Sequence, residues 1–216
     1  MAGSAAVTAA WLRRSAAMVH ERRAWLTELD AAIGDGDHGI NLDRGFEAVT
    51  ADLDGGAIPT DDVGAMLQGT GRRLLGLVGG ASGALYGRAF MTAGERIAAS
   101  PADRRPGSWA LAEIALAAAV DGIVGLGRAV PGDKTMLDAL VPALHAIRKG
   151  APDEPLDSVL ARAAEAAEAG AATTIPMIAR KGRASYLGDR SAGHLDPGAA
   201  SSAILVRCLA EVLAAR

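Results

Sequence analysis

Aromatic residues are scarce in this chain of 216 residues. They make up only 3% of the sequence, although half of the residues are hydrophobic, so alanine and leucine carry most of the apolar content. Sheet proteins usually rely on aromatic and β-branched side chains, whereas alanine and leucine favour helix. The composition therefore predicts an all-α protein. A chain of this length can bury a full core, and no linker divides it, so we expect one domain over residues 1–216.

Cysteines, basic clusters and long apolar runs are also lacking. The formal net charge is −3 without a run of lysine or arginine, which argues against nucleic acid as a partner. The lone Cys208 cannot form an internal disulfide, and its apolar surroundings predict a core position in a reducing compartment. Residues 1–10 lack the basic segment of a signal peptide. Residues 111–126 are the most apolar stretch, but they are short for a membrane span and contain Glu113 and Asp121. We expect a cytoplasmic protein without a membrane partner.

Helical periodicity recurs along the sequence, interrupted by clusters of glycine, proline and aspartate. We expect nine helical segments, or eight helices if the first two are continuous. They cover approximately residues 5–21, 23–33, 40–53, 61–78, 82–99, 108–126, 135–149, 156–179 and 196–216. Thr60 is the expected N-cap of the fourth segment. We also expect a kink at Pro142 and a bend near Pro176.

The least regular sequence falls in alternate connections between these segments, at residues 35–41, 79–83, 127–136 and 180–198. Consecutive helices of an up-and-down bundle are antiparallel, so alternate connections lie at the same end. Glycine-rich turns gathered there let backbone N–H groups approach an anion closely. The pattern predicts an anion-binding opening at one end of the bundle.

Three carboxylates, Asp30, Asp35 and Asp37, lie within eight positions around Gly34 and Gly36. Like charges this close repel each other, and a hard cation among their oxygens removes that cost. Magnesium suits the site best, because a few carboxylates hold it while phosphate oxygens fill its other positions. The alternative is a set of solvated turn aspartates. This is a weaker reading for Asp30, because negative charge near a helix C-terminus is unfavourable.

Two familiar loops fail to fit. Residues 35–37 match the first and third positions of an EF-hand, but Ile40 stands where its glycine belongs and Phe46 where its glutamate belongs. Residues 132–135 resemble the end of a phosphate-binding P-loop, but Asp133 separates the glycine from the lysine and no strand precedes them. We reject both assignments.

Other segments leave two readings open. The helix start at residues 38–41 can hold a phosphate, or it can be an ordinary start with a surface histidine. Arg183 can offer a bidentate fork from residues 180–190, which otherwise form a solvated loop. Met136 can line an adenine pocket or pack in the core. The sequence does not assign roles to Lys134 or His194.

Two further segments carry weak signals on their own. The glycine run at residues 79–83 suits an anion, yet it is also a common turn between helices. For Asp196 and Pro197, helix capping is a sufficient explanation.

Taken together and in order, five segments resemble the nucleotide-binding L subunit of dihydroxyacetone kinase over nearly the whole chain. They are residues 29–41 (Leu29-Asp30 and Gly34 to Asn41), 79–83, 131–138, 180–188 and 193–199. The resemblance implies an eight-helix antiparallel barrel with the nucleotide at one end. It implies that Asp30, Asp35 and Asp37 hold two magnesium ions against the phosphates of ADP or ATP. It carries the nucleotide contacts over to His38, Gly39, Ile40, Asn41, Ala81, Ser82, Gly127, Met136, Arg183, Asp196, Pro197 and Gly198.

The resemblance also implies partners. A separate K subunit would hold dihydroxyacetone covalently through its own histidine. Because stand-alone L subunits resemble the phosphotransferase-system form, we expect bound ADP to be phosphorylated by a multiphosphoryl M subunit. We expect no catalytic residue in this chain, a homodimer, and a possible transcriptional regulator as a further partner. The alternatives are a subunit of an ATP-dependent kinase for another small ketose, and a nucleotide-dependent regulatory adapter.

Overall fold

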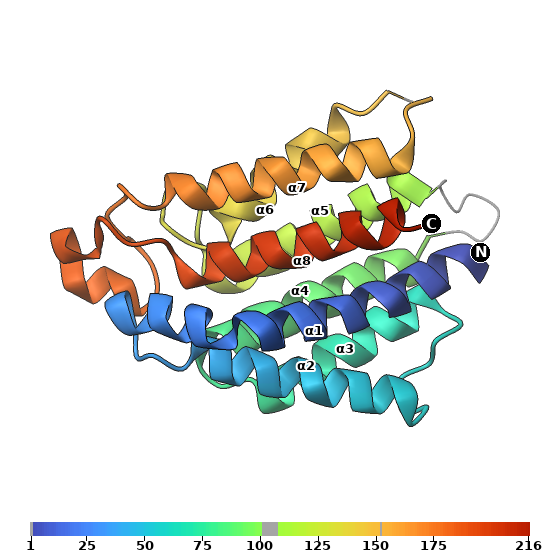
Figure 1. Ribbon diagram of the computed structural model, residues 1–216, viewed down its shortest axis with the longest axis horizontal. Helices are drawn as coiled ribbons and strands as arrows, with labels where there is room; N and C mark the ends of the chain where they lie inside the picture. The colour runs from blue at the N-terminus through green and yellow to red at the C-terminus, as the bar shows by residue number, and fades with distance from the viewer. Residues whose placement is uncertain (1, 101–107, 152) are drawn as a thin grey trace.

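The computed structural model describes residues 2–100, 108–151 and 153–216, and helices dominate it (Figure 1). The described elements are α1 (Ala2–Ile33), α2 (His38–Asp54), α3 (Val63–Leu77), α4 (Gly80–Ala98), α5 (Ser108–Gly127), α6 (Leu137–Arg148), α7 (Leu156–Thr173), the 3₁₀ helix η2 (Arg183–Ser191) and α8 (Pro197–Ala214). No strand occurs among these residues. The prediction of an all-α protein is confirmed.

Neighbouring helices run up and down, and α1 packs against both α2 and α8, which closes the arrangement. Both chain termini lie at one end of the long axis, as Figure 1 shows. The connections α1–α2, α3–α4, α5–α6 and α7–α8 therefore meet at the opposite end. This is the shared end that the sequence pattern predicts.

The first two segments form one continuous helix, α1, which is the eight-helix alternative of the prediction. Two other predicted boundaries are wrong. The N-cap of α3 is Asp62 rather than Thr60, because the Asp62 carboxylate accepts the Ala65 N–H at 2.7 Å. Helix α7 ends at Thr173 instead of continuing to residue 179, so Pro176 lies in the following turn.

Two other predictions concern prolines. Helix α6 continues through Pro142 as one helix. Proline has no N–H group, so the carbonyl of Asp138, four residues earlier, lacks its helical donor. Gly170 of α7 lies against that carbonyl. A Cβ at residue 170 would lie 2.2 Å from that carbonyl oxygen. The predicted start of α8 is confirmed: Pro197 is its first residue, and the Asp196 carboxylate accepts the Ala199 N–H at 2.7 Å.

The interior is apolar, and the predicted core position of Cys208 is confirmed because that residue is fully buried. A cavity of about 480 Å³, partly open to solvent, lies among the helices, and most of its lining comes from α1, α4, α5 and α8. Trp11, Phe90, Leu116 and Leu209 are among its lining residues, and none of the three clustered aspartates lines it. The cavity is therefore separate from the aspartate bend, which is the turn at residues 34–37 between α1 and α2, next to Asp30.

Within the described residues, two helices are long and apolar enough, by length and composition alone, to cross a membrane. They are residues 110–127 of α5 and 197–214 of α8, so the exclusion of residues 111–126 by length and charge was too strict. Of the α8 window, 56% is buried, as in the core helix of a soluble protein, whereas 22% of the α5 window is buried. Such helices are weak evidence for a membrane.

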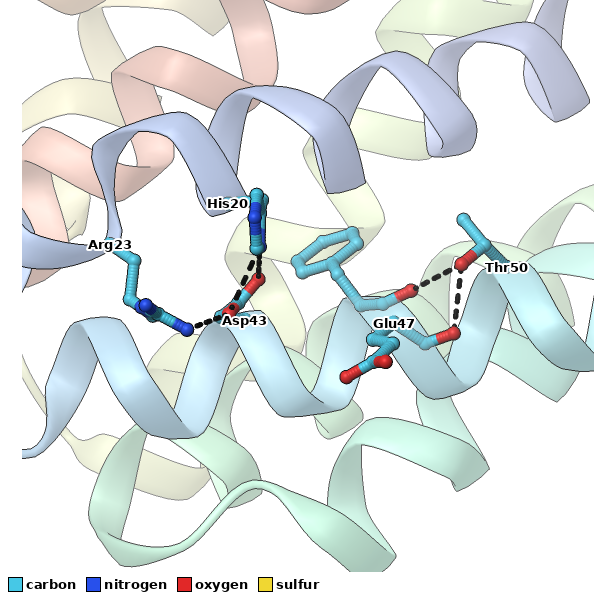
Figure 2. A network of polar contacts seen from close by, with 6 residues as sticks. His20, Arg23, Asp43, Glu47 and Thr50 are labelled. Atoms are coloured by element: carbon cyan, nitrogen blue, oxygen red, sulfur yellow. Dashed lines mark hydrogen bonds and ion pairs between the residues drawn. The ribbon is translucent and has the colours of Figure 1, made fainter.

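A polar brace joins α1 to α2 next to the aspartate bend (Figure 2). The Asp43 carboxylate lies 3.1 Å from His20 Nδ1 and 3.2 Å from the Arg23 guanidinium, both on α1. Gly39 packs directly on α1, since a Cβ there would lie 2.1 Å from the Arg23 carbonyl oxygen and 2.6 Å from Thr27 Oγ1. The brace and the close crossing hold the start of α2 against the last turns of α1.

Helices α3 and α4 approach so closely that glycines are required at their contact. A Cβ on Gly71 would lie 2.6 Å from the Gly87 carbonyl oxygen and 2.7 Å from the Met91 backbone nitrogen. Gly64 and Gly94 face each other on the same pair of helices, seven residues from Gly71 and Gly87 respectively. Backbone atoms are the obstacle, so rotation of a side chain cannot make room.

We predict that Gly71→Ala lowers the free energy of unfolding by about 1–3 kcal/mol, because the added methyl forces α3 and α4 apart. Gly76→Ala is the matched control on α3, where a Cβ meets nothing within 4 Å. It should leave stability unchanged or raise it by up to about 1 kcal/mol, through better helix propensity. Urea unfolding followed by circular dichroism measures both. Equal stability of the two variants would contradict the packing described.

Candidate functional site

The aspartate bend connects α1 to α2 and brings three carboxylates together. One oxygen from each of Asp30, Asp35 and Asp37 lies within 4.8 Å of the others. Gly36 has a φ of +74°, which favours glycine, and a Cβ on Gly34 would lie 2.1 Å from Asp30 Oδ1. These two glycines let the chain reverse without displacing the carboxylate. The cluster predicted from sequence thus exists in the structure.

Asp30 has two tasks at this bend. Its Oδ2 accepts the backbone N–H groups of Asp37, at 2.9 Å, and His38, at 3.2 Å, so it caps the start of α2. A carboxylate is well placed there, because the N–H groups of a helix start carry partial positive charge. The Asp30 side chain also brings an oxygen into the cluster with the other two carboxylates. A site made of oxygen ligands alone suits a hard cation such as Mg²⁺.

The segment after α7 folds over the bend instead of forming the irregular loop that the sequence left open. Helix η2 places the Arg183 guanidinium 3.1 Å from Asp35 Oδ2, and both side chains are partly exposed. Ala184 of η2 packs with Ile33 and Ala179 in a small apolar cluster of its own. An exposed cation therefore lies beside the carboxylates on an anchored support.

The start of α4 faces the start of α2. The Arg44 guanidinium donates to Asn41 Oδ1 at 2.9 Å and to the Leu77 carbonyl at 2.8 Å. Because arginine only donates, the Asn41 amide oxygen must face Arg44 and its NH₂ group must face elsewhere. That NH₂ nitrogen lies 3.2 Å from where a Cβ on Gly79 would be, beside the glycine turn before α4. Two helix N-termini and an amide donor thus converge, which suits a phosphate.

A buried polar network connects the start of α2 to α4 and α8. His38 is only 6% exposed, so the reading of a surface histidine is wrong. Its Nε2 lies 2.9 Å from Ser201 Oγ, and the Tyr86 hydroxyl lies 2.7 Å from Ser201 Oγ and 2.9 Å from Ser202 Oγ. Burial lowers the pKa of His38, against the opposing effect of Asp30 and Asp37, and raises the pKa of Tyr86 to about 12.

Sequence reasoning missed this network. The available signal was the pair of serines at residues 201 and 202, inside a mostly apolar helix.

The connection between α5 and α6 is tied to the segment before α8. The Asp138 carboxylate accepts the N–H groups of Gly132 and Thr135, which closes the turn. Lys134 is 1% exposed and donates to the carbonyls of Thr174, at 2.6 Å, and His194. His194 thus contributes its carbonyl, while the residue itself is exposed.

Met136 and the first turn of α8 are neighbours at this end. Met136 is 3% exposed, and its Cβ lies 3.6 Å from where a Cβ on Gly198 would be. Asp196, two residues earlier, is buried and caps α8. Burial raises the pKa of Asp196 to about 7, although the Ala199 N–H and Lys134 act in the opposite direction.

The structure gathers the residues singled out in the sequence at one end, but they differ in exposure. Asn41 and Met136 are buried, whereas Ile40, Ala81 and Arg183 are exposed. Ser82 and Gly127 are intermediate, at the start of α4 and the end of α5. The exposed members are accessible from solvent at that end of the bundle.

Comparisons with known proteins give a consistent result. Residues 32–211 match the family described as the DAK2 domain. The chain is 43% identical over 203 residues to the ADP-binding subunit of the PEP-dependent dihydroxyacetone kinase of Escherichia coli (strain K12), covering 93% of each. It is 37% identical over 208 residues to the ADP-binding subunit of the PTS-dependent dihydroxyacetone kinase of Lactococcus lactis, covering 96% of this chain and 97% of the relative.

A solved structure agrees with these relatives. The dihydroxyacetone kinase of C. freundii, in complex with AMP-PNP and Mg²⁺, is similar at a TM-score of 0.71 and 29% identity over 95% of this chain. This chain spans 34% of the length of that kinase chain.

The buried Asp196 carboxyl predicts a pH effect on stability. Its pKa of about 7 lies above the ordinary value of 3.8, so the native state keeps a proton that the unfolded state releases between these values. Its contribution to stability therefore falls as pH rises through that window. Asp196→Asn removes the titration and keeps an oxygen to cap α8.

We expect the free energy of unfolding of Asp196→Asn, relative to the unsubstituted protein, to rise by on the order of 1–3 kcal/mol between about pH 4.5 and pH 8. Urea unfolding of both proteins, without nucleotide or Mg²⁺, measures this difference. A difference that stays constant with pH would show that burial does not raise the pKa of Asp196.

Proposed function

The chain belongs to the DAK2 domain family, and on that premise we propose that it is the ADP-binding subunit of a dihydroxyacetone kinase, active only with partner subunits. The observation that carries the proposal is the convergence of three carboxylates within 4.8 Å, beside the N-termini of two helices. The near full-length similarity to ADP-binding subunits in E. coli and Lactococcus lactis supports it. One nucleotide-binding domain over residues 1–216, in the cytoplasm, is the organisation that we propose.

Asp30, Asp35 and Asp37 would hold Mg²⁺, and the family resemblance suggests two ions. Bound there, Mg²⁺ neutralises phosphate oxygens. The backbone N–H groups at residues 38–41 and 81–82, with the Asn41 amide, would hold the phosphates of ADP or ATP. The Arg183 guanidinium, 3.1 Å from Asp35, lies within reach of the same anion. Met136 and residues 196–198 would hold the rest of the nucleotide, with Gly127 nearby at the end of α5.

Phosphoryl transfer depends on positioning and charge neutralisation more than on covalent help from the protein. The buried His38 fits this role, because its Nε2 lies 2.9 Å from Ser201 Oγ and orients the helix start instead of facing solvent. We therefore assign no nucleophile or general base to this chain. Its residues bind the nucleotide, orient it and present it to another subunit.

We propose that the phosphoryl group comes from the phosphotransferase system. A multiphosphoryl M subunit would phosphorylate the bound ADP, and the phosphoryl group would pass to dihydroxyacetone held by a separate K subunit. The names of the two relatives, PEP-dependent and PTS-dependent, support this route over exchange of free ATP. We also propose that the chain forms a homodimer and that a transcriptional regulator is a further partner.

Both partners must reach the same nucleotide, so their docking surface must surround the opening. Several large apolar side chains are exposed at that end, in the connections and helix ends that form the site. They are Ile40, Leu126, Val130, Ile175, Ile178 and Tyr186. Tyr186 on η2 is 88% exposed. Exposed apolar and aromatic side chains around a functional site are typical of protein interfaces. We propose that the surface formed by these six side chains binds the K and M subunits in turn.

Single substitutions of the clustered aspartates test the metal site. We predict that Asp30→Asn, Asp35→Asn and Asp37→Asn each weaken Mg²⁺-dependent ADP binding by about tenfold or more, since each removes a charged ligand. Asp54→Asn is the matched control, because Asp54 pairs with Arg13 on the surface at the other end of α2. Isothermal titration calorimetry with ADP and Mg²⁺ gives the affinities. Unchanged affinity in all three variants would remove the metal assignment.

A transfer assay tests the proposed phosphoryl donor. The purified protein should retain ADP, detectable by mass spectrometry after denaturation. Mixed with a K subunit and dihydroxyacetone, it should turn over with a phosphorylated M subunit and show little turnover with free ATP. Turnover with free ATP alone would favour the ATP-dependent alternative. Nucleotide binding without transfer under either condition would favour the regulatory adapter.

A further inference from the structure

Lys134 takes no part in the site as proposed, yet its burial is unusual. It is 1% exposed, and it is the only buried lysine or arginine among the residues whose burial the structure describes. Its backbone φ is +64°, a conformation that side-chain-bearing residues rarely adopt. A buried ammonium in a strained backbone position persists only where the surroundings hold it firmly. The neighbouring contacts show what it is holding.

The Lys134 ammonium joins three separate segments. From the α5–α6 connection it donates to the Thr174 carbonyl just after α7, at 2.6 Å, and to the His194 carbonyl before α8. Thr174 continues the link, because its Oγ1 accepts the Asp196 N–H at 3.0 Å. The position of residues 194–196 is therefore fixed twice, once directly and once through Thr174.

The charges around Lys134 also favour a buried ammonium at this place. Asp138 and Asp196 are buried carboxylates that favour its charged form, against the lowering of the Lys134 pKa by burial. Lys134 in turn favours the ionised form of Asp196, the N-cap of α8. Removing the ammonium would break both links to the segments around Thr174 and His194, and it would take from Asp196 a cation that favours its ionised form.

Two candidate nucleotide contacts lie on either side of this link. Met136 is two residues after Lys134, and Gly198 is two residues after Asp196. Their backbones are in contact, since a Cβ on Gly198 would lie 3.6 Å from both the Cβ and the backbone nitrogen of Met136. Lys134 thus links the segment that carries Met136 to the segment that leads into Gly198.

We propose that Lys134 is a positioning residue for the nucleoside part of the bound nucleotide. It holds Met136 and residues 196–198 at a fixed spacing, while the aspartate bend and the starts of α2 and α4 hold the phosphates independently. This inference rests on the proposed function, because it takes the ligand to be a nucleotide.

The division of labour can be tested by comparing ADP with inorganic pyrophosphate, which lacks the nucleoside. Calorimetric titrations in the presence of Mg²⁺ should show that Lys134→Met weakens ADP binding by about tenfold or more, because Met136 and residues 196–198 are no longer preorganised. Pyrophosphate affinity should change by less than about twofold. Lys149→Met is the matched control, since Lys149 is an exposed lysine at the opposite end of α6 and should alter neither affinity.

A second pair of variants keeps the test decisive if Lys134→Met does not fold. Thr174→Val removes the hydroxyl that accepts the Asp196 N–H and retains the shape of the side chain. It should weaken ADP binding by about threefold or more without affecting pyrophosphate. Thr174→Ser keeps the hydroxyl and should bind ADP as the unsubstituted protein does.

Three results would overturn the inference: unchanged ADP affinity in folded Lys134→Met, equal losses for ADP and pyrophosphate, or equal behaviour of Thr174→Val and Thr174→Ser. The proposed function fails differently, because the unsubstituted protein would then bind neither ADP nor pyrophosphate in the presence of Mg²⁺.

Discussion

The hydrogen bonds that the Asp30 carboxylate accepts from the backbone N–H groups of Asp37 and His38 govern the functional end of the molecule. One side chain stabilises the reversal between α1 and α2, satisfies two N–H groups at the start of α2, and joins the carboxylate cluster. Elsewhere, a carboxylate in the last turns of a helix is electrostatically unfavourable. Here the start of the next helix compensates it. The close packing of Gly39 on α1 keeps these groups within reach.

Local sequence predicts much of the fold because most helix ends are specified by nearby residues. The Asp196–Pro197 pair specifies the start of α8, and the glycines of the aspartate bend specify the reversal after α1. Prediction fails where tertiary contacts decide. Apolar periodicity continues past Thr173, but α7 ends there, and the chain beyond it is held by bonds such as Lys134 to Thr174. Helix η2 is anchored through its contact with Ile33, far away in the sequence.

The same limit applies to the candidate site. The carboxylates lie within eight positions of one another, so their convergence can be read from a single turn. The supporting contacts cannot, because His38 and Ser201 are separated by 163 residues and Lys134 and His194 by 60. Buried serines and a buried lysine have no local signature that distinguishes them from surface residues. Only the packed bundle shows that they are satisfied.

The position of the two chain termini has a practical consequence. Both lie at the end of the bundle opposite the aspartate bend (Figure 1). An affinity tag, a fluorophore or a tether to a sensor chip attached at either terminus would leave the nucleotide-proximal face pointing into solution. Immobilised molecules would then share one orientation, which suits single-molecule or surface-based measurements of how other proteins arrive at that face and leave it.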